Sequence, residues 1–173
     1  MLNRAPSLVL IGLSGAGKSA VAAWLGKTLS LPVLEVGSFV RAEAKSKNRN
    51  PLEYANDTFR RGGFLHFVTQ VPGAAPSFPV IIVGPRRPEE IRYLREKVAP
   101  CVVTLLEASF DVRSMRKFGR AQSAGLRHRD GIELSWGFDS TRRLADVTVD
   151  AEQDFPTVVR DVRDGWKFVD IGN

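Results

Sequence analysis

A glycine-rich octet near the N-terminus constrains this chain more than any other feature. Residues 12–19 read Gly-Leu-Ser-Gly-Ala-Gly-Lys-Ser and match the pattern Gly-x-x-x-x-Gly-Lys-Ser/Thr at every defined position. An aliphatic run, Ser7–Ile11, comes directly before it. Apolar residues recur after it at helical spacing, at Val21, Leu25 and Leu29. A strand, a glycine loop and a helix in this order predict a phosphate-binding P-loop.

The residue types of the octet fit a bound nucleoside triphosphate. Main-chain N–H groups of such a loop turn inward around phosphate oxygens, and the positive end of the following helix attracts the same anion. Lys18 is expected to reach the β- and γ-phosphates, and the Ser19 hydroxyl to bind the Mg²⁺ that bridges them. We therefore expect ATP and Mg²⁺ as cofactors. The residues expected to bind the nucleotide are Gly12, Ser14, Gly15, Ala16, Gly17, Lys18 and Ser19.

Size and composition predict a single cytoplasmic domain. With 173 residues the chain can bury one core, and we expect one domain over residues 1–173. The sequence has no run of about 18 apolar residues, so we expect no membrane partner; the single cysteine, Cys101, suits a reducing compartment. A formal charge of +6 favours anionic partners, without distinguishing phosphorylated small molecules from nucleic acid. The oligomeric state stays open between a monomer and a homodimer.

Strand-like and helix-like segments alternate along the chain, which is typical of a parallel sheet covered by helices on both faces. After Ser7–Ile11, aliphatic runs predict four more strands, over residues 32–36, 79–83, 101–106 and 146–149. Ser38 is expected to cap a helix, and Pro88 to begin another. Further helices are predicted over residues 52–59, 64–71, 109–118, 129–144 and 155–162, and a loop over residues 72–76.

Four segments together resemble the nucleoside-monophosphate-kinase branch of P-loop proteins, in particular small proteins similar to dephospho-CoA kinase and adenylate kinase. They are residues 12–19, residues 37–41, residues 84–91, and residues 129–137 with the sequence Arg-Asp-Gly-Ile-Glu-Leu-Ser-Trp-Gly. The resemblance implies a three-layer α/β P-loop NTPase fold whose five parallel strands follow the order 2-3-1-4-5. It further implies a short helical substrate-binding insertion at about 44–78 and an arginine-rich lid at about 116–130.

Arginines near the expected lid are candidates for stabilising charge during transfer. Phosphoryl transfer requires positioning and positive charge around the migrating group. Closure of the lid would bring Arg116 and Arg120 onto the phosphates. These two residues, with Lys18 and Glu35, are therefore the expected catalytic set, and Arg120 is also expected to bind the nucleotide.

On the acceptor side the resemblance implies Arg41, near the phosphate or hydroxyl of the incoming substrate. Three further residues, Ser38, Arg61 and Arg127, complete the expected substrate-binding set.

Two positions depart from the pattern of the family. Relatives carry an acid directly after the glycine where this chain has Ser38, and another at the end of the third strand where it has Val83. Glu35 is the expected substitute near the P-loop, although a solvated acid at a strand end would give the same pattern. Asp57 and Asp130 are weaker candidates, and the choice of base stays open.

Three functions are compatible with these residues. The first is an ATP-dependent kinase that transfers the γ-phosphoryl group to a nucleotide-like acceptor: a nucleoside, a nucleoside monophosphate or dephospho-CoA. The second phosphorylates a hydroxymethylated base, such as 5-hydroxymethyluracil, in phage-like DNA, which the basic charge favours. The third is a nucleotide-binding module that no longer catalyses, which the missing acids at Ser38 and Val83 suggest.

Overall fold

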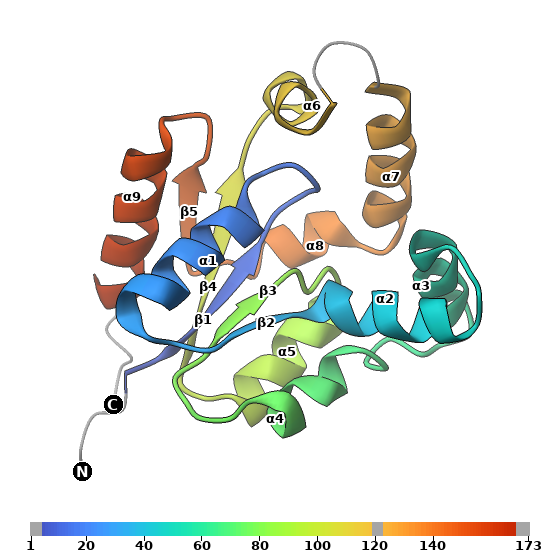
Figure 1. The fold of residues 1–173 in the computed structure, drawn as a ribbon, viewed down its shortest axis with the longest axis horizontal. Helices are drawn as coiled ribbons and strands as arrows, with labels where there is room; N and C mark the ends of the chain where they lie inside the picture. Colours follow the sequence, from blue (N-terminus) through green and yellow to red (C-terminus); the bar gives the residue numbers. More distant parts are fainter. Residues whose placement is uncertain (1–4, 119–122, 169–173) are drawn as a thin grey trace.

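The computed structural model describes residues 5–118 and 123–168, and in this part of the chain it forms a parallel sheet of five strands (Figure 1). The order across the sheet is β2-β3-β1-β4-β5, and every neighbouring pair is parallel. This confirms the predicted α/β class and strand order. The strands are β1 (Ser7–Ile11), β2 (Val33–Glu35), β3 (Ile81–Val83), β4 (Cys101–Glu107) and β5 (Val147–Asp150).

Helices cover both faces of the sheet, with α1 and α9 on one face and α5 and α8 on the other (Figure 1). None of the described helices is both long and apolar enough to cross a membrane. The helices are α1 (Lys18–Leu29), α2 (Val36–Ser46), α3 (Pro51–Arg60), α4 (Val71–Ala74), α5 (Pro88–Lys97), α6 (Phe110–Phe118), α7 (Ser123–Ser135), α8 (Phe138–Arg142) and α9 (Phe155–Phe168), with one 3₁₀ turn, η1 (Val68–Gln70).

The central strand β1 divides the core in two. Successive side chains of a strand point to opposite faces of the sheet. Leu8 and Leu10 therefore pack with α1 and α9, whereas Val9 and Ile11 pack with α3 and α5. All four are fully buried, and burial of each such side chain contributes about 1.5–3 kcal/mol. The P-loop thus begins from the most buried strand of the sheet, which fixes its position.

Local signals explain the starts of two helices. Helix α3, predicted over residues 52–59, begins at Pro51, and Asn50 Oδ1 accepts hydrogen bonds there from the N–H groups of Leu52 (2.9 Å) and Glu53 (3.3 Å). Helix α2 begins at Val36, so Ser38 is not its N-cap. The Ser38 hydroxyl instead donates to the Glu35 carbonyl at 2.6 Å from inside the first turn.

Three predicted boundaries are wrong for identifiable reasons. Residues 64–70 form turns and η1 rather than one helix. The predicted loop at 72–76 contains most of α4, which begins at Val71 and has Pro72 in its first turn, where a missing N–H is tolerated. The predicted helix over 129–144 is two helices, because Gly137 adopts a left-handed conformation (φ +90°).

The carboxyl ends of β1, β2 and β3 meet at one edge of the sheet. The P-loop follows β1, Glu35 ends β2, and Val83 ends β3. In open α/β sheets this edge is where ligands bind.

Candidate functional site

The P-loop forms a close-fitting cradle at the start of α1. Gly15 has φ +88°, and a Cβ there would lie 2.9 Å from the carbonyl oxygen of Arg113. At Gly12, with φ +147°, a Cβ would lie 2.5 Å from the carbonyl oxygen of Leu106. Only glycine fits such positions. The cradle therefore depends on the glycines of the octet and fits the main-chain phosphate site that the sequence predicts.

Lys18 is 8% exposed and folds back over the loop. Its Nζ donates hydrogen bonds to the carbonyl oxygens of Gly12 (2.7 Å) and Leu13 (3.0 Å). The ammonium group is thus held at the mouth of the cradle, where an incoming polyphosphate would meet it.

Arg113 clamps the P-loop from α6, a role that sequence reasoning missed. Arg113 is 3% exposed, and its Nη1 donates to the carbonyl oxygen of Ser14 at 2.9 Å. It also forms a bidentate ion pair with Asp130, from Nη1 to Oδ1 at 3.0 Å and from Nη2 to Oδ2 at 2.7 Å. Asp130 therefore holds the arginine that supports the loop. The arginine-rich composition around residue 116 was visible in the sequence, but a buried member of that run was not.

Glu35 lies beside the hydroxyl that is expected to bind magnesium. A hydrogen bond from Ser19, together with Arg41, lowers the pKa of the Glu35 carboxyl, and burial opposes that shift. Arg41 Nη2 donates to Glu35 Oε2 at 3.0 Å. The structure therefore joins Ser19, Glu35 and Arg41 in one chain of contacts, with the carboxylate ionised.

The surface around the P-loop is hollowed into a cavity of about 530 Å³, which we call the P-loop cavity. Its lining includes Lys18, Glu35, Arg41 and Arg116, so the structure brings most of the expected catalytic residues together. Arg116 also donates from Nη2 to the carbonyl oxygen of Ala151, at 2.6 Å. The remaining members are Ser14, Gly15, Gly17, Ser19, Ala20, Gly37, Val83, Gly84, Arg86 and Arg129.

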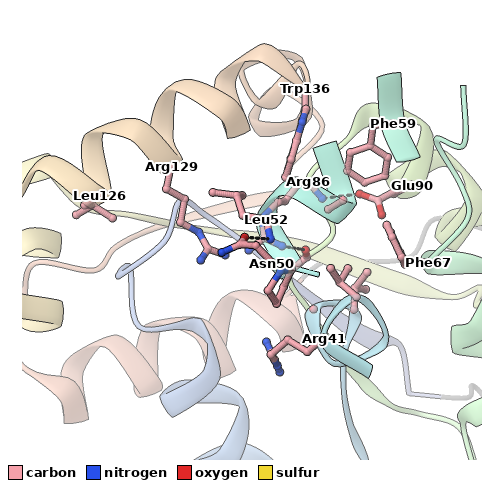
Figure 2. Close-up of a pocket in the computed structure, with 17 residues that line it drawn as sticks. Arg41, Asn50, Leu52, Phe59, Phe67, Arg86, Glu90, Leu126, Arg129 and Trp136 are labelled. Atoms are coloured by element: carbon pink, nitrogen blue, oxygen red, sulfur yellow. Dashed lines mark hydrogen bonds between the residues drawn. The ribbon is translucent and has the colours of Figure 1, made fainter. Parts of the chain in front are cut away.

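A second cavity of about 390 Å³, here the acceptor-side cavity, lies between α2, α3 and α7. Figure 2 shows Phe59, Phe67 and Glu90 gathered toward one end, and Leu126 and Arg129 toward the other. Apolar side chains form much of the remaining wall: Val36, Val40, Leu52, Ala55 and Trp136. Arginines line it as well, and Figure 2 shows Arg129 coming from α7 and Arg41 from α2.

The two cavities border one another. Five residues line both of them: Gly37, Arg41, Gly84, Arg86 and Arg129. Three of the five carry a positive charge, so the boundary is strongly attractive to an anion.

Glu90 is a buried acid of the acceptor-side cavity that sequence reasoning did not single out. It is 1% exposed, and its Oε2 accepts hydrogen bonds from the backbone N–H groups of Arg86 (2.6 Å) and Arg87 (2.9 Å). Burial raises the pKa of the carboxyl to about 7, against the opposing effect of those hydrogen bonds. Its position three residues into a helix that begins with proline was the available signal.

Glu133, a second buried acid, was named only as part of a motif. It is 0% exposed, and its Oε1 lies 3.0 Å from Arg86 Nε and 2.9 Å from Arg129 Nε. Burial disfavours its charge, but Arg86, Lys18 and Arg129 outweigh that effect and lower its pKa to about 2. The carboxylate is therefore ionised at any ordinary pH.

Several expected residues lie elsewhere. Arg120 falls outside the described residues. Arg61 and Arg127 are not among the described residues that line the two cavities; the Arg127 guanidinium stacks on the Phe110 ring at 4.1 Å. The Ser38 hydroxyl is engaged by the Glu35 carbonyl.

The weaker acid candidate Asp57 lies on α3, where it pairs with Arg49 at 2.5 Å. Burial raises the pKa of the Cys101 thiol to about 11, in keeping with a structural thiol rather than a nucleophile.

Comparison with known proteins gives a fold and distant relatives. No protein-family model matches the chain. UPF0200 proteins of Methanosarcina mazei and Methanosarcina acetivorans are each 25% identical over 91% of this chain and 91% of their own length. A gluconokinase from Sinorhizobium meliloti superposes with a TM-score of 0.67 at 19% identity, over 94% of this chain and 92% of its own. A shikimate kinase from Aquifex aeolicus gives 0.61 at 16% identity, over 96% and 99%. The chain therefore has the fold of these P-loop kinases.

Proposed function

We propose that this protein is an ATP- and Mg²⁺-dependent phosphotransferase that acts on a small anionic acceptor. The observation that carries the proposal is the shared border of the two cavities, at Arg41, Arg86 and Arg129. A donor site and an acceptor site must meet where the phosphoryl group passes, and positive charge there stabilises the transfer. The likeness in fold to a gluconokinase and to shikimate kinases supports this class of reaction.

The chain's own residues would divide the work as follows. The P-loop N–H groups and Lys18 hold the triphosphate, and Ser19 supplies the hydroxyl that would bind the metal. Mg²⁺, when bound, neutralises charge on the phosphates. Glu35 has a lowered pKa, which suits it to hold Ser19 and water in place rather than to accept a proton. Arg41 then orients the acceptor, because it faces both cavities while it pairs with Glu35.

The shape of the acceptor-side cavity favours a nucleotide-like small molecule. Its volume of about 390 Å³ falls in the range of small-molecule sites, and aromatic walls beside an arginine border suit a ring that carries an anionic group. DNA with a hydroxymethylated base is the second candidate acceptor, favoured by the net charge of +6 and by arginines in the segment expected to bind the substrate. The contact between Glu35 and Ser19 argues against a module that has lost catalysis, since an acid is present where the metal would bind.

The proposal is tested by transfer of label from γ-³²P ATP with Mg²⁺. The acceptor panel holds nucleosides, nucleoside monophosphates, dephospho-CoA, gluconate, shikimate and 5-hydroxymethyluracil DNA. We expect a labelled small-molecule product that the Lys18→Ala variant does not make. Glu96→Gln, a charge change at a 69% exposed side chain, is the matched control and should behave like the wild type. Intact ATP binding with no transfer to any acceptor would refute the proposal, and label in DNA alone would favour the second candidate.

A further inference from the structure

Glu133 is a fully buried carboxylate that contacts two of the three arginines at the cavity border, Arg86 and Arg129. Arg86 follows β3, and Arg129 lies on α7. Both approach the same oxygen, Oε1, through Nε: Arg129 by a hydrogen bond of 2.9 Å, and Arg86 by an ion pair of 3.0 Å. Glu133 therefore touches each guanidinium on its inner edge.

The outer ends of these guanidiniums are left for other partners. Arg86 Nη1 donates to the carbonyl oxygen of Gly84 at 3.0 Å. Within residues 5–118 and 123–168, Arg86 Nη2 and both Nη atoms of Arg129 make no hydrogen bond. Both side chains line both cavities. Three N–H₂ donors thus stand at the border without a partner from the described chain.

The cost of this arrangement marks it as more than a surface ion pair. Glu133 Oε2 is buried without a hydrogen-bond partner among the described residues, and Arg86 Nε meets Oε1 at 3.0 Å as an ion pair without a hydrogen bond. A buried polar atom without a hydrogen-bond partner costs about 1–3 kcal/mol. An arrangement tuned for stability alone would complete these hydrogen bonds or replace the ion pair by apolar side chains.

We propose that Glu133 is a positioning residue that fixes Arg86 and Arg129 by their Nε edges, so that their Nη donors face the border where the phosphoryl group passes. The inference rests on the proposed function for its last step, the passage of the group. Donors that are already fixed need no reorganisation when charge develops, which is how preorganised donors stabilise a transition state. The group that these Nη donors would bind is a phosphate oxygen of the substrate at the border of the two cavities.

The first test is a spectroscopic one on the unchanged protein. Nε–H signals of Arg86 and Arg129, assigned through Arg86→Lys and Arg129→Lys, should be sharp and slow to exchange with solvent. Addition of tripolyphosphate should shift both sets of signals, because the Nη ends meet the anion. In Glu133→Ala, which has no side-chain oxygen to accept them, both Nε–H signals should exchange rapidly. Protected Nε–H signals in that variant would overturn the inference.

The second test separates positioning from folding. Glu133→Ala, which removes the oxygen that both arginines approach, should lower kcat by about 100-fold or more, as loss of fixed donors does. The Kd for the Mg²⁺ complex of a non-hydrolysable ATP analogue should change far less than kcat, since in the described part of the chain Glu133 makes no hydrogen bond or ion pair with the P-loop and acts on Lys18 only through its charge. Glu133→Asp retains the charge and should restore part of kcat. An unchanged kcat in Glu133→Ala would contradict the inference.

Two further outcomes are informative. If Glu133→Ala does not fold, the variant with both Glu133→Ala and Arg129→Gln balances the charge and takes its place; full protection of Arg86 Nε–H in it would overturn the inference. If the wild type transfers no phosphate at all, the proposed function fails. The tripolyphosphate titration still decides the positioning role, because a response in the wild type that Glu133→Ala abolishes supports it and an equal response in both proteins refutes it.

Discussion

The Glu90→Gln variant should alter how the stability of this protein depends on pH. Glu90 is 1% exposed at the start of α5, and burial raises the pKa of its carboxyl from 4.5 to about 7. Glutamine has nearly the same shape, and its amide oxygen can accept the two backbone hydrogen bonds that Oε2 accepts from Arg86 and Arg87. The substitution therefore removes the titration and leaves the capping of the helix in place.

The sign and size of the effect follow from the two pKa values. Between pH 4.5 and about 7 the unfolded chain has lost the Glu90 proton while the folded protein retains it. Unfolding then releases a proton, so the free energy of unfolding falls as pH rises through this window. The difference between 4.5 and about 7 corresponds to about 3 kcal/mol, lost by the wild type and not by Glu90→Gln.

Urea unfolding at a series of pH values from 4 to 8.5 measures this difference, because other titrating groups cancel between the two proteins. We expect Glu90→Gln to gain about 3 kcal/mol relative to the wild type across the window and nothing above it. Glu89→Gln, at a neighbouring carboxylate that is 36% exposed, is the matched control and should give a constant difference. Parallel wild-type and Glu90→Gln curves would refute a pKa of about 7 for the buried carboxyl.

Three further outcomes are expected. Lys18→Ala should weaken binding of the Mg²⁺–ATP analogue by about 10- to 100-fold in calorimetry, the usual effect of a lost charged donor, and an unchanged Kd would contradict this. Asp130→Asn should lower the free energy of unfolding by about 3–5 kcal/mol, because Arg113 keeps a buried charge without its partner; a loss below about 1 kcal/mol would show the pair to be dispensable. Trp136→Phe removes the 2.9 Å hydrogen bond from Trp136 Nε1 to Asn56 Oδ1 and should lower the free energy of unfolding by about 1–2 kcal/mol. Differential scanning calorimetry measures this loss, and an unchanged melting temperature would contradict it.

Local patterns of the sequence carried most of the fold. The P-loop octet and the aliphatic runs predicted β1, α1 and the remaining strands, because a buried parallel strand is a short apolar run. The strand order was implied only by the resemblance to P-loop kinases, and the structure confirms it. Proline and asparagine at the start of α3 also acted locally. The break at Gly137 was not predicted, since a glycine in a helical pattern is tolerated unless the tertiary structure requires φ +90° there.

The site was predictable where it is local and not where it depends on distant contacts. Lys18 and Ser19 follow from their own octet. Glu133 lies next to Arg86 only because α7 folds over the loop after β3, and that contact joins residues 47 positions apart along the chain. Arg113 reaches the P-loop across 99 positions. No periodicity within either segment reports such a pairing.

The two acids that the chain lacks at Ser38 and Val83 have a consequence for how the site is assembled. A carboxylate acts on a metal or an arginine through its distance and its charge, whichever strand or helix supplies it. Glu35, three residues before Ser38 at the end of β2, already touches Ser19 and Arg41. Negative charge therefore stands beside the hydroxyl that we propose to bind the metal, although Ser38 occupies the position where the resemblance implies an acid. Absence of an acid at one aligned position is thus weak evidence for lost catalysis, since neighbouring strands end at the same edge of the sheet and can exchange the role.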